Sequence, residues 1–173
     1  MTASLTRHWI IAALLASAAM LAGAHAFETF GGYRPCSLCM RQREVYWAAI
    51  TIAAAGLILP RLWKSPFRPR AACALLGGAF LVSVAVATYH AGVEWKFWPG
   101  PTTCTNVDNS ALSVEDITKA LTGVTRAVPC DEAAWRDPVV KLSMAGWNAL
   151  VSLALAGFSF LAAATPIART DND

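Results

Sequence analysis

Four long apolar runs dominate this sequence and constrain its fold more than any other feature. They cover residues 9–27, 40–59, 71–90 and 144–164. A helix needs about 20 mostly apolar residues to cross a bilayer, and inside hydrocarbon its backbone must satisfy its own hydrogen bonds. The chain is only 14% charged, whereas a soluble domain is roughly 25% charged. We therefore predict an all-α integral membrane four-helix bundle, with a single membrane domain over residues 1–173.

Local signals bear on the ends of these runs. Pro60 and Pro166 follow the second and fourth runs, where they are expected to end helices, because proline removes a backbone donor. The first run has an alternative interpretation. Arg7, the apolar stretch and Ala24-His25-Ala26 imitate a secretory signal peptide with its cleavage site. The stretch exceeds the usual apolar region of about 7–15 residues, which favours a retained helix.

Basic residues indicate the side of the membrane that each connection faces. The connection over residues 60–70 has no acid and four basic residues, Arg61, Lys64, Arg68 and Arg70. We therefore expect this connection and both termini to be cytoplasmic, and the connections 28–39 and 91–143 to lie outside. Arg34, Arg41 and Arg43 stand near the first outer connection and argue against this orientation. We assign Arg43 to a site rather than to topology.

The long outer connection contains one predicted helix of its own. Ser113 and Asp116 are spaced as a variant of the capping box. Apolar residues recur there at helical spacing, namely Leu112, Ile117, Ala120, Leu121 and Val124. A short amphipathic helix on the membrane surface is therefore expected over residues 113–122.

A C-x-x-C motif stands at the start of the second run. Cys36 and Cys39 follow Pro35, which suits a helix entry. Their spacing places both sulfurs on one face of a turn, where the helix dipole favours the thiolate. Arg43, one turn further on, adds a cation that favours a Cys39 thiolate. The motif predicts a redox-active pair. A structural disulfide and a metal site are alternatives, although zinc normally takes four ligands.

Two more cysteines, Cys104 and Cys130, lie in the long outer connection. A disulfide between them could stabilise the loop by about 3–4 kcal/mol on chain-entropy grounds. From the residues alone, a structural bond and a relay to the first pair are both open. Four cysteines on the outer side suit an oxidising compartment. Cys73, inside the third run, is expected to be a small buried residue without a role.

Two ionisable residues, His90 and Glu94, stand four positions apart where the third helix is expected to continue into the interface. Such groups are costly at membrane depth and are usually functional. We expect either a proton relay to a reduced carrier or two water-exposed interfacial groups. The net charge of +3 is small, and no basic stripe is interleaved with aromatics, so nucleic acid is not expected as a partner.

Together, these features resemble the DsbB family, the bacterial inner-membrane disulfide bond formation protein B. The resemblance rests on the four apolar runs, the C-x-x-C motif with Arg43 below it, and the outer cysteines Cys104 and Cys130. It also includes the segment over residues 90–104 (HAGVEWKFWPGPTTC), and it covers nearly the whole chain. The family carries a glutamine near its quinone site, where this sequence reads Glu94-Trp95-Lys96.

The resemblance implies a quinone-linked thiol oxidase with periplasmic cysteines. Its Cys104–Cys130 disulfide would oxidise a DsbA-like thioredoxin-fold protein, supporting disulfide formation in exported proteins. The Cys36–Cys39 pair would reoxidise Cys104 and Cys130. Cys39 would then pass electrons to ubiquinone or menaquinone, and so to the respiratory chain. Candidates for the quinone site are Arg43, His90 and Glu94. No metal is expected. The alternatives are a four-helix membrane scaffold with structural loop disulfides and a metal-binding membrane protein.

Overall fold

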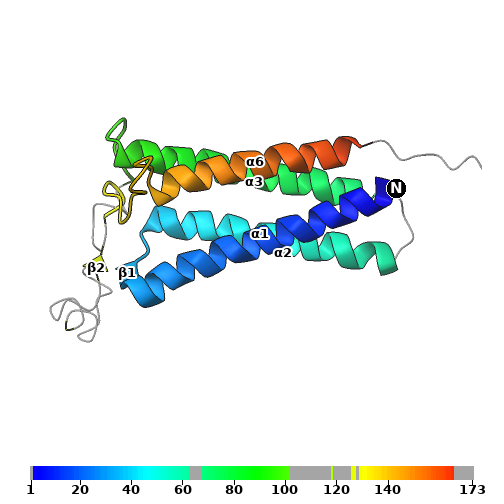
Figure 1. Cartoon of the computed structure of the whole chain (residues 1–173), viewed down its shortest axis with the longest axis horizontal. Coiled ribbons are helices and arrows are strands. Elements are labelled where there is room, and N and C mark those ends of the chain that lie inside the picture. The colour runs from blue at the N-terminus through cyan, green and yellow to red at the C-terminus, as the bar shows by residue number, and fades with distance from the viewer. Residues whose placement is uncertain (1, 63–67, 102–117, 119–125, 128, 166–173) are drawn as a thin grey trace, which may run out of the picture.

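Four long helices form a bundle in the computed structural model, which describes residues 2–62, 68–101, 118, 126–127 and 129–165. The helices are α1 (Thr2–Gly31), α2 (Ser37–Leu62), α3 (Arg68–Glu94) and α6 (Met144–Ala164). Two short strands, β1 (Tyr33–Arg34) and β2 (Arg126–Ala127), complete the described elements. Figure 1 shows the helices side by side along one axis. The predicted all-α four-helix bundle is confirmed.

Three of the described helices are long and apolar enough to cross a membrane, over Leu5–Gly31, Pro69–Glu94 and Met144–Ala164. The first turns of α2 carry Arg41, Arg43 and Glu44, and we treat its part from Met40 to Leu59 as the fourth span. Large apolar side chains cover the outside of the bundle. Leu15, Leu75 and Leu161 are 61%, 62% and 67% exposed. Such a surface suits lipid rather than water as the solvent.

The four helices contain the four predicted runs and extend beyond three of them, most of all α1, which covers Thr2–Gly31 around the run 9–27. α6 has the predicted bounds, and α3 continues past His90 to Glu94, as expected at the interface. Pro60, however, does not end α2, which continues to Leu62. Pro60 lacks the N–H that would bond the carbonyl of Gly56, but the two residues after it can still donate within the helix. The helix predicted over residues 113–122 lies outside the described residues, apart from Thr118.

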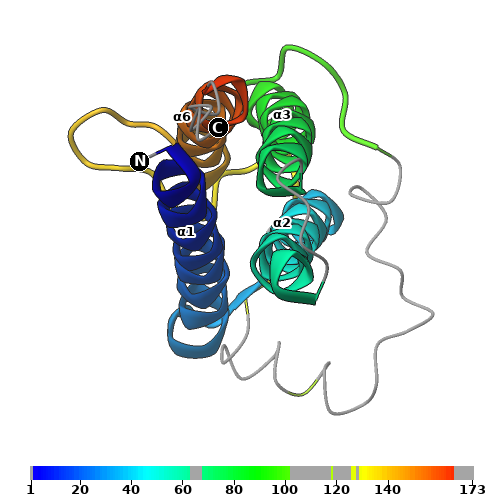
Figure 2. The ribbon, with the colours of Figure 1, turned by 90° about the vertical axis from the view of Figure 1, so that its right-hand side faces the viewer.

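Small residues allow the helices to approach closely. The buried core includes alanines from every long helix, Ala13, Ala49, Ala53, Ala72, Ala87, Ala156 and Ala162. Figure 2 shows α3 lying beside both α2 and α6, and these pairs make the most extensive helix contacts. Within lipid, helices associate largely through such close packing, because burial from water contributes little between them.

Two glycines offer a matched test of this packing. A methyl group added at Gly56 on α2 would lie 2.6 Å from Cβ of Ala72 on α3, whereas nothing lies within 4 Å of one added at Gly78. We expect Gly56→Ala to lower the free energy of unfolding by roughly 1–3 kcal/mol through overpacking. Gly78→Ala should leave it unchanged or raise it, because alanine favours a helix by about 1 kcal/mol over glycine. Thermal midpoints in detergent measure both, and the reverse order would contradict this view of the α2–α3 contact.

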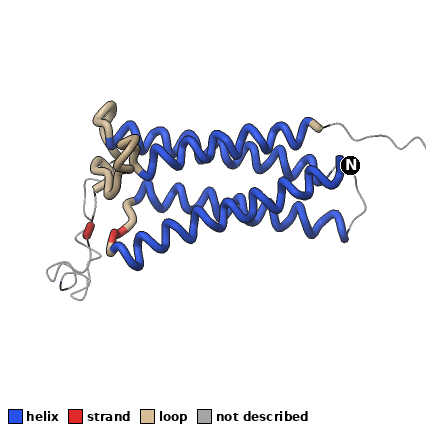
Figure 3. The backbone as a smooth tube through the Cα atoms, viewed as in Figure 1, coloured by secondary structure: helices blue, strands red, loops and turns tan. Residues whose placement is uncertain are grey.

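The described parts of the α1–α2 and α3–α6 connections meet at one end of the bundle. β1 pairs in parallel with β2, with Tyr33 opposite Arg126 and Arg34 opposite Ala127. Figure 1 shows this ladder at the end opposite the N-terminus and the end of α6. Figure 3 shows the loops gathered at the same end. The C-x-x-C motif and the Cys130 segment therefore lie on the same side of the bundle.

The end of α3 also holds the segment around Cys130. Lys96 has a left-handed backbone conformation, with φ of 62°. The N–H of Phe97 donates to the carbonyl of Gly92 at 2.9 Å, the long bond of a Schellman motif. The Lys96 side chain forms an ion pair with Asp131, the neighbour of Cys130. This exposed pair contributes little stability, but it marks where the loop returns to α3.

Candidate active site

The start of α2 positions the C-x-x-C motif. Cys36 is the residue before the helix, and its carbonyl accepts the N–H of Met40 at 3.0 Å. The sulfur of Cys36 accepts the N–H of Cys39 at 3.2 Å, so it takes the place of a capping oxygen. Pro35 therefore precedes the cap instead of occupying the first helical position. Cys36 and Cys39 are both free thiols, partly exposed at the bundle end.

The two thiols differ in acidity. The pKa of Cys36 is raised, first by its hydrogen bond with the Cys39 sulfur and then by burial. The same hydrogen bond lowers the pKa of Cys39 against the opposing effect of burial, and the nearby charge of Arg43 lowers it further. Cys39, above the spanning part of α2, is therefore the sulfur that ionises first. The predicted effect of Arg43 on this thiolate agrees with its position.

Arg43 joins α2 to α1. Its Nη1 lies 2.6 Å from Oε2 of Glu28, and its Nη2 donates to the carbonyl of Ala24 at 3.1 Å. The side chain of Arg43 is only 12% exposed. The sequence interpretation missed Glu28, whose only signal is an acid placed directly after an uncharged apolar run. The cation near Cys39 is thus oriented by a carboxylate from the neighbouring helix.

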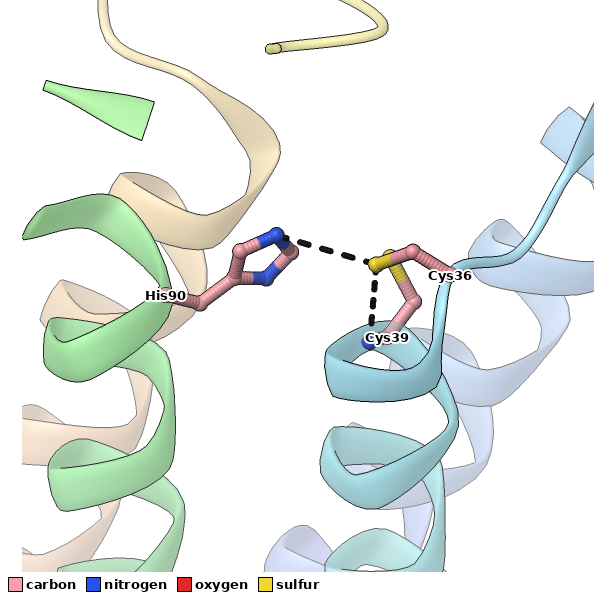
Figure 4. Close-up of side chains that lie close together, drawn as sticks. All are labelled: Cys36, Cys39 and His90. Atoms are coloured by element: carbon pink, nitrogen blue, oxygen red, sulfur yellow. Dashed lines mark hydrogen bonds between the residues drawn. The ribbon is translucent and has the colours of Figure 1, made fainter. Parts of the chain in front are cut away.

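The ring of His90 points from α3 toward the cysteine pair (Figure 4). Its Nε2 lies 3.7 Å from the sulfur of Cys36 and 3.8 Å from Oε1 of Glu94. His90 and Glu94 are 4% and 8% exposed, so neither is the water-exposed group that one alternative expected. Among the described residues, Oε2 of Glu94 is buried without a hydrogen-bond partner.

A buried chain of polar side chains leads from His90 into the bundle, and the sequence interpretation missed it. Nε2 of Gln42 lies 2.7 Å from Nδ1 of His90. Asn148 donates to Oε1 of Gln42 at 2.5 Å, and the Tyr46 hydroxyl donates to Oδ1 of Asn148 at 2.5 Å. A signal exists in the last apolar run, where small and polar residues recur every three or four positions, at Ala145, Asn148, Ser152, Ala156 and Ser159.

Cys130 lies against the C-x-x-C motif. It is 1% exposed and disulfide-bonded, and it packs in one cluster with Leu38, Val93 and Cys36. Its sulfur is 3.7 Å from the hydroxyl oxygen of Ser37. Of the predicted site residues, the structure brings six together, Cys36, Cys39, Arg43, His90, Glu94 and Cys130. Cys104 lies outside the described residues. Cys73 is buried in the core of the bundle.

A cavity of about 550 Å³ adjoins the thiols. Apolar side chains from α1 and α6 line it, including Met20, Leu21, Phe27, Met144 and Val151. Its polar lining comes from the site, with Cys36, Cys39, Gln42, Arg43, His90 and Glu94. Pockets for small molecules usually measure about 300–1,000 Å³ and combine apolar walls with a few polar groups. This cavity has the size and lining to bind an apolar molecule with a polar head.

Three side chains also have the chemistry of metal ligands. Cys36, Cys39 and His90 each place one ligand atom so that all three atoms lie within 4.8 Å of one another. Thiolates and imidazole are the ligands that zinc prefers, and structural sites normally have four of them. The sequence interpretation considered a metal only for the cysteines and did not place His90 among them.

Comparison with known protein families shows which family the protein belongs to. The family model for "Disulfide bond formation protein DsbB" matches residues 6–162 of the chain. The protein belongs to the DsbB family. The match covers all four helices almost completely, and it confirms the resemblance seen in the motifs. Neither a curated protein nor a solved structure matches the chain.

DsbB-family membership gives the bundle its setting and its general activity. The protein is a membrane four-helix bundle of a family that functions in disulfide bond formation. Its α2 is the fourth membrane helix. Family membership implies a disulfide oxidoreductase, an activity that requires thiols able to exchange. The free pair at the start of α2 and the disulfide-bonded Cys130 beside it have the chemistry that this activity needs.

Proposed function

We propose that this DsbB-family protein oxidises a DsbA-like periplasmic dithiol protein and passes the electrons to a membrane quinone, ubiquinone or menaquinone. It would lie in the bacterial inner membrane, with cytoplasmic termini and periplasmic cysteines, and would feed the respiratory chain. One observation carries the proposal. Disulfide-bonded Cys130 packs in one apolar cluster with Cys36, whose thiol and that of Cys39 are both free.

Exchange would begin at a Cys104–Cys130 disulfide. A thiolate of the reduced partner attacks the sulfur of Cys104, and Cys130 leaves as a thiolate. The partner's second thiolate then attacks its first sulfur, which releases Cys104 and leaves the partner oxidised. The two electrons taken from the partner now reside on the reduced Cys104 and Cys130 pair. We assign the outer contact to Cys104 because Cys130 is only 1% exposed.

The second exchange would use the contact at Cys36. The Cys130 thiolate attacks Cys36 of a Cys36–Cys39 disulfide, and Cys39 leaves with the electron pair. Cys104 then attacks Cys130, which restores the outer disulfide and releases Cys36 as a thiolate. Thiols of lower pKa leave faster, so the lowered pKa of Cys39 favours its departure in the first of these steps.

The cavity beside Cys39 fits a quinone. Its apolar walls suit the ring and an isoprenoid tail, while Arg43 and His90 offer donors for a carbonyl oxygen. Oε2 of Glu94, buried and without a partner among the described residues, is free to accept a hydrogen bond there. When bound, a quinone supplies an acceptor for two electrons and two protons. Arg43 would orient it, and the apolar walls would exclude water.

Covalent trapping tests the proposal. In full-length protein carrying Cys130→Ser, the Cys104 thiolate attacks the disulfide of the oxidised partner, one partner sulfur leaves as a thiolate, and a mixed disulfide forms. No Cys130 thiol remains to displace the partner from Cys104, so the mixed disulfide should accumulate. We expect a species of higher mass in bacterial membranes that disappears with reductant. Mass spectrometry should identify a DsbA-like protein joined through Cys104.

Two variants control the trapping experiment. The double variant Cys104→Ser/Cys130→Ser should trap nothing, and adding Cys73→Ser to Cys130→Ser should leave the trapped species unchanged. If Cys130→Ser forms no mixed disulfide with any periplasmic protein, the outer disulfide is structural and the membrane scaffold replaces the thiol oxidase.

A further inference from the structure

The hydrogen bonds that link Tyr46, Asn148, Gln42 and His90 all run with donors and acceptors in a fixed order. Oδ1 of Asn148 accepts from the Tyr46 hydroxyl at 2.5 Å, and the Ser152 hydroxyl, 3.2 Å from the same oxygen, lies nearer to Oγ of Ser83 at 2.8 Å. The amide nitrogen of Asn148 donates to Oε1 of Gln42 at 2.5 Å. That bond orients the Gln42 amide, so its NH₂ group faces Nδ1 of His90 at 2.7 Å. Each amide in the chain thus fixes the orientation of the next.

This order of donors and acceptors determines which nitrogen of His90 carries the proton. An amide NH₂ can only donate, so Nδ1 must accept with its lone pair, and the single N–H of a neutral imidazole must be at Nε2. The groups on the other side of the ring are acceptors, the Cys36 sulfur at 3.7 Å and Oε1 of Glu94 at 3.8 Å. The main-chain carbonyl of Cys130 is a further acceptor for the ring N–H.

We propose that Gln42 and Asn148 are positioning residues that hold His90 in its Nε2–H tautomer, directed at the sulfur of Cys36. The role of this tautomer rests on the proposed thiol exchange. When Cys104 attacks Cys130, an S–S bond forms between them, the Cys36–Cys130 bond breaks, and the electron pair stays on Cys36. The Nε2–H group donates a hydrogen bond to that thiolate as it leaves. His90 therefore acts as a donor to the sulfur and not as a base.

The same tautomer disfavours a metal at the three clustered ligands. A metal-bound histidine coordinates through one nitrogen and donates its other N–H to an acceptor. Here the amide nitrogen of Gln42 faces Nδ1, so the lone pair is at Nδ1 and a proton occupies the nitrogen nearest the sulfurs. Cys36, Cys39 and His90 are therefore arranged for hydrogen bonding between imidazole and thiolate.

Nitrogen NMR of the histidine rings tests the tautomer directly, because protonated and unprotonated ring nitrogens have well separated shifts. The sample is the full chain in detergent with ¹⁵N-labelled histidine, at rest, without thiol partner or quinone. The chain has three histidines, and the signals lost in His90→Asn identify His90. We expect a protonated Nε2 and an unprotonated Nδ1. The opposite pattern in the unaltered protein overturns the inference, whatever the variants do.

Variants of Gln42 test whether the buried polar side chains set the tautomer of His90. An ionised Gln42→Glu side chain offers only acceptors, so Nδ1 must become protonated and its signal should move to the protonated range. Gln42→Met offers neither donor nor acceptor and should give a mixture of tautomers. Ser17→Ala is the control, since Ser17 is buried on α1 and is not one of the hydrogen-bonded residues that lead from His90. It should leave the His90 signals unchanged. An unchanged spectrum in Gln42→Glu would overturn the inference. Trapping through Cys104 is measured separately, so the two proposals can fail independently.

Discussion

Replacement of Cys39 by serine is expected to abolish quinone reduction driven by a reduced periplasmic thiol protein. Serine cannot form a disulfide, and its hydroxyl does not ionise at neutral pH. In the proposed mechanism, every electron pair leaves the protein through Cys39, the thiol of lowered pKa that lines the cavity. We expect activity to fall by roughly a thousandfold or more, as for other residues on which a whole mechanism depends. The loss of quinone absorbance with purified protein measures it.

Two further cysteine variants show whether the loss of activity is specific to the inner pair. Cys36→Ser should cause an equal loss, because in either variant the Cys130 thiolate has no inner disulfide to attack. Cys73→Ser should keep activity near that of the parent, since Cys73 is buried in the bundle core away from the site. Quinone reduction at the full rate in either Cys36→Ser or Cys39→Ser would rule out the proposed route.

Replacement of Arg43 by alanine is expected to weaken quinone binding far more than thiol exchange. Hydrogen bonds to charged groups contribute about 1.5–3 kcal/mol, and 1.4 kcal/mol corresponds to a factor of about ten in affinity. The apparent KM for quinone should therefore rise roughly ten- to a hundredfold. The rate of disulfide exchange should change less, because Arg43 contacts Glu28 and Ala24 rather than either sulfur. Steady-state kinetics with varied quinone gives the first value, and stopped-flow thiol exchange gives the second.

The same helix supplies a matched control for Arg43. The side chain of Arg41 is 72% exposed and pairs with exposed Glu44, so Arg41→Ala should leave the KM for quinone unchanged. Glu28→Gln keeps a hydrogen-bond acceptor for Arg43 but removes its charge, and it should have a smaller effect than Arg43→Ala. An unchanged KM in Arg43→Ala would remove this arginine from the quinone site.

The fold was predictable because lipid imposes a simple rule on sequence. A segment that crosses a bilayer must be long, apolar and helical, and these properties gave the bounds of α6 without error. Pro60 misled because a proline removes the hydrogen bond of its own nitrogen alone, so a helix can continue past it. Which faces pack together was less predictable, since residues facing lipid and residues facing other helices are both apolar.

The site was predictable only where its residues are close in sequence. The spacing of Cys36, Cys39 and Arg43 along one helix places them together by geometry alone, and the same holds for His90 and Glu94. The link from Gln42 to Asn148 joins positions 106 apart in the sequence, so no local pattern could show it. Glu28 was missed for the same reason, because its partner stands on another helix.

The two-residue ladder between β1 and β2 works as a tether. Cys36 follows Arg34 by two residues, and Cys130 follows Ala127 by three. A fully extended chain spans at most about 3.3–3.6 Å per residue, so each cysteine stays within roughly 7–11 Å of the ladder while its main-chain bonds last. In the proposed exchange, Cys130 could therefore move away from the inner pair only over that short range. The ladder would keep its sulfur within reach of Cys36 from one cycle to the next.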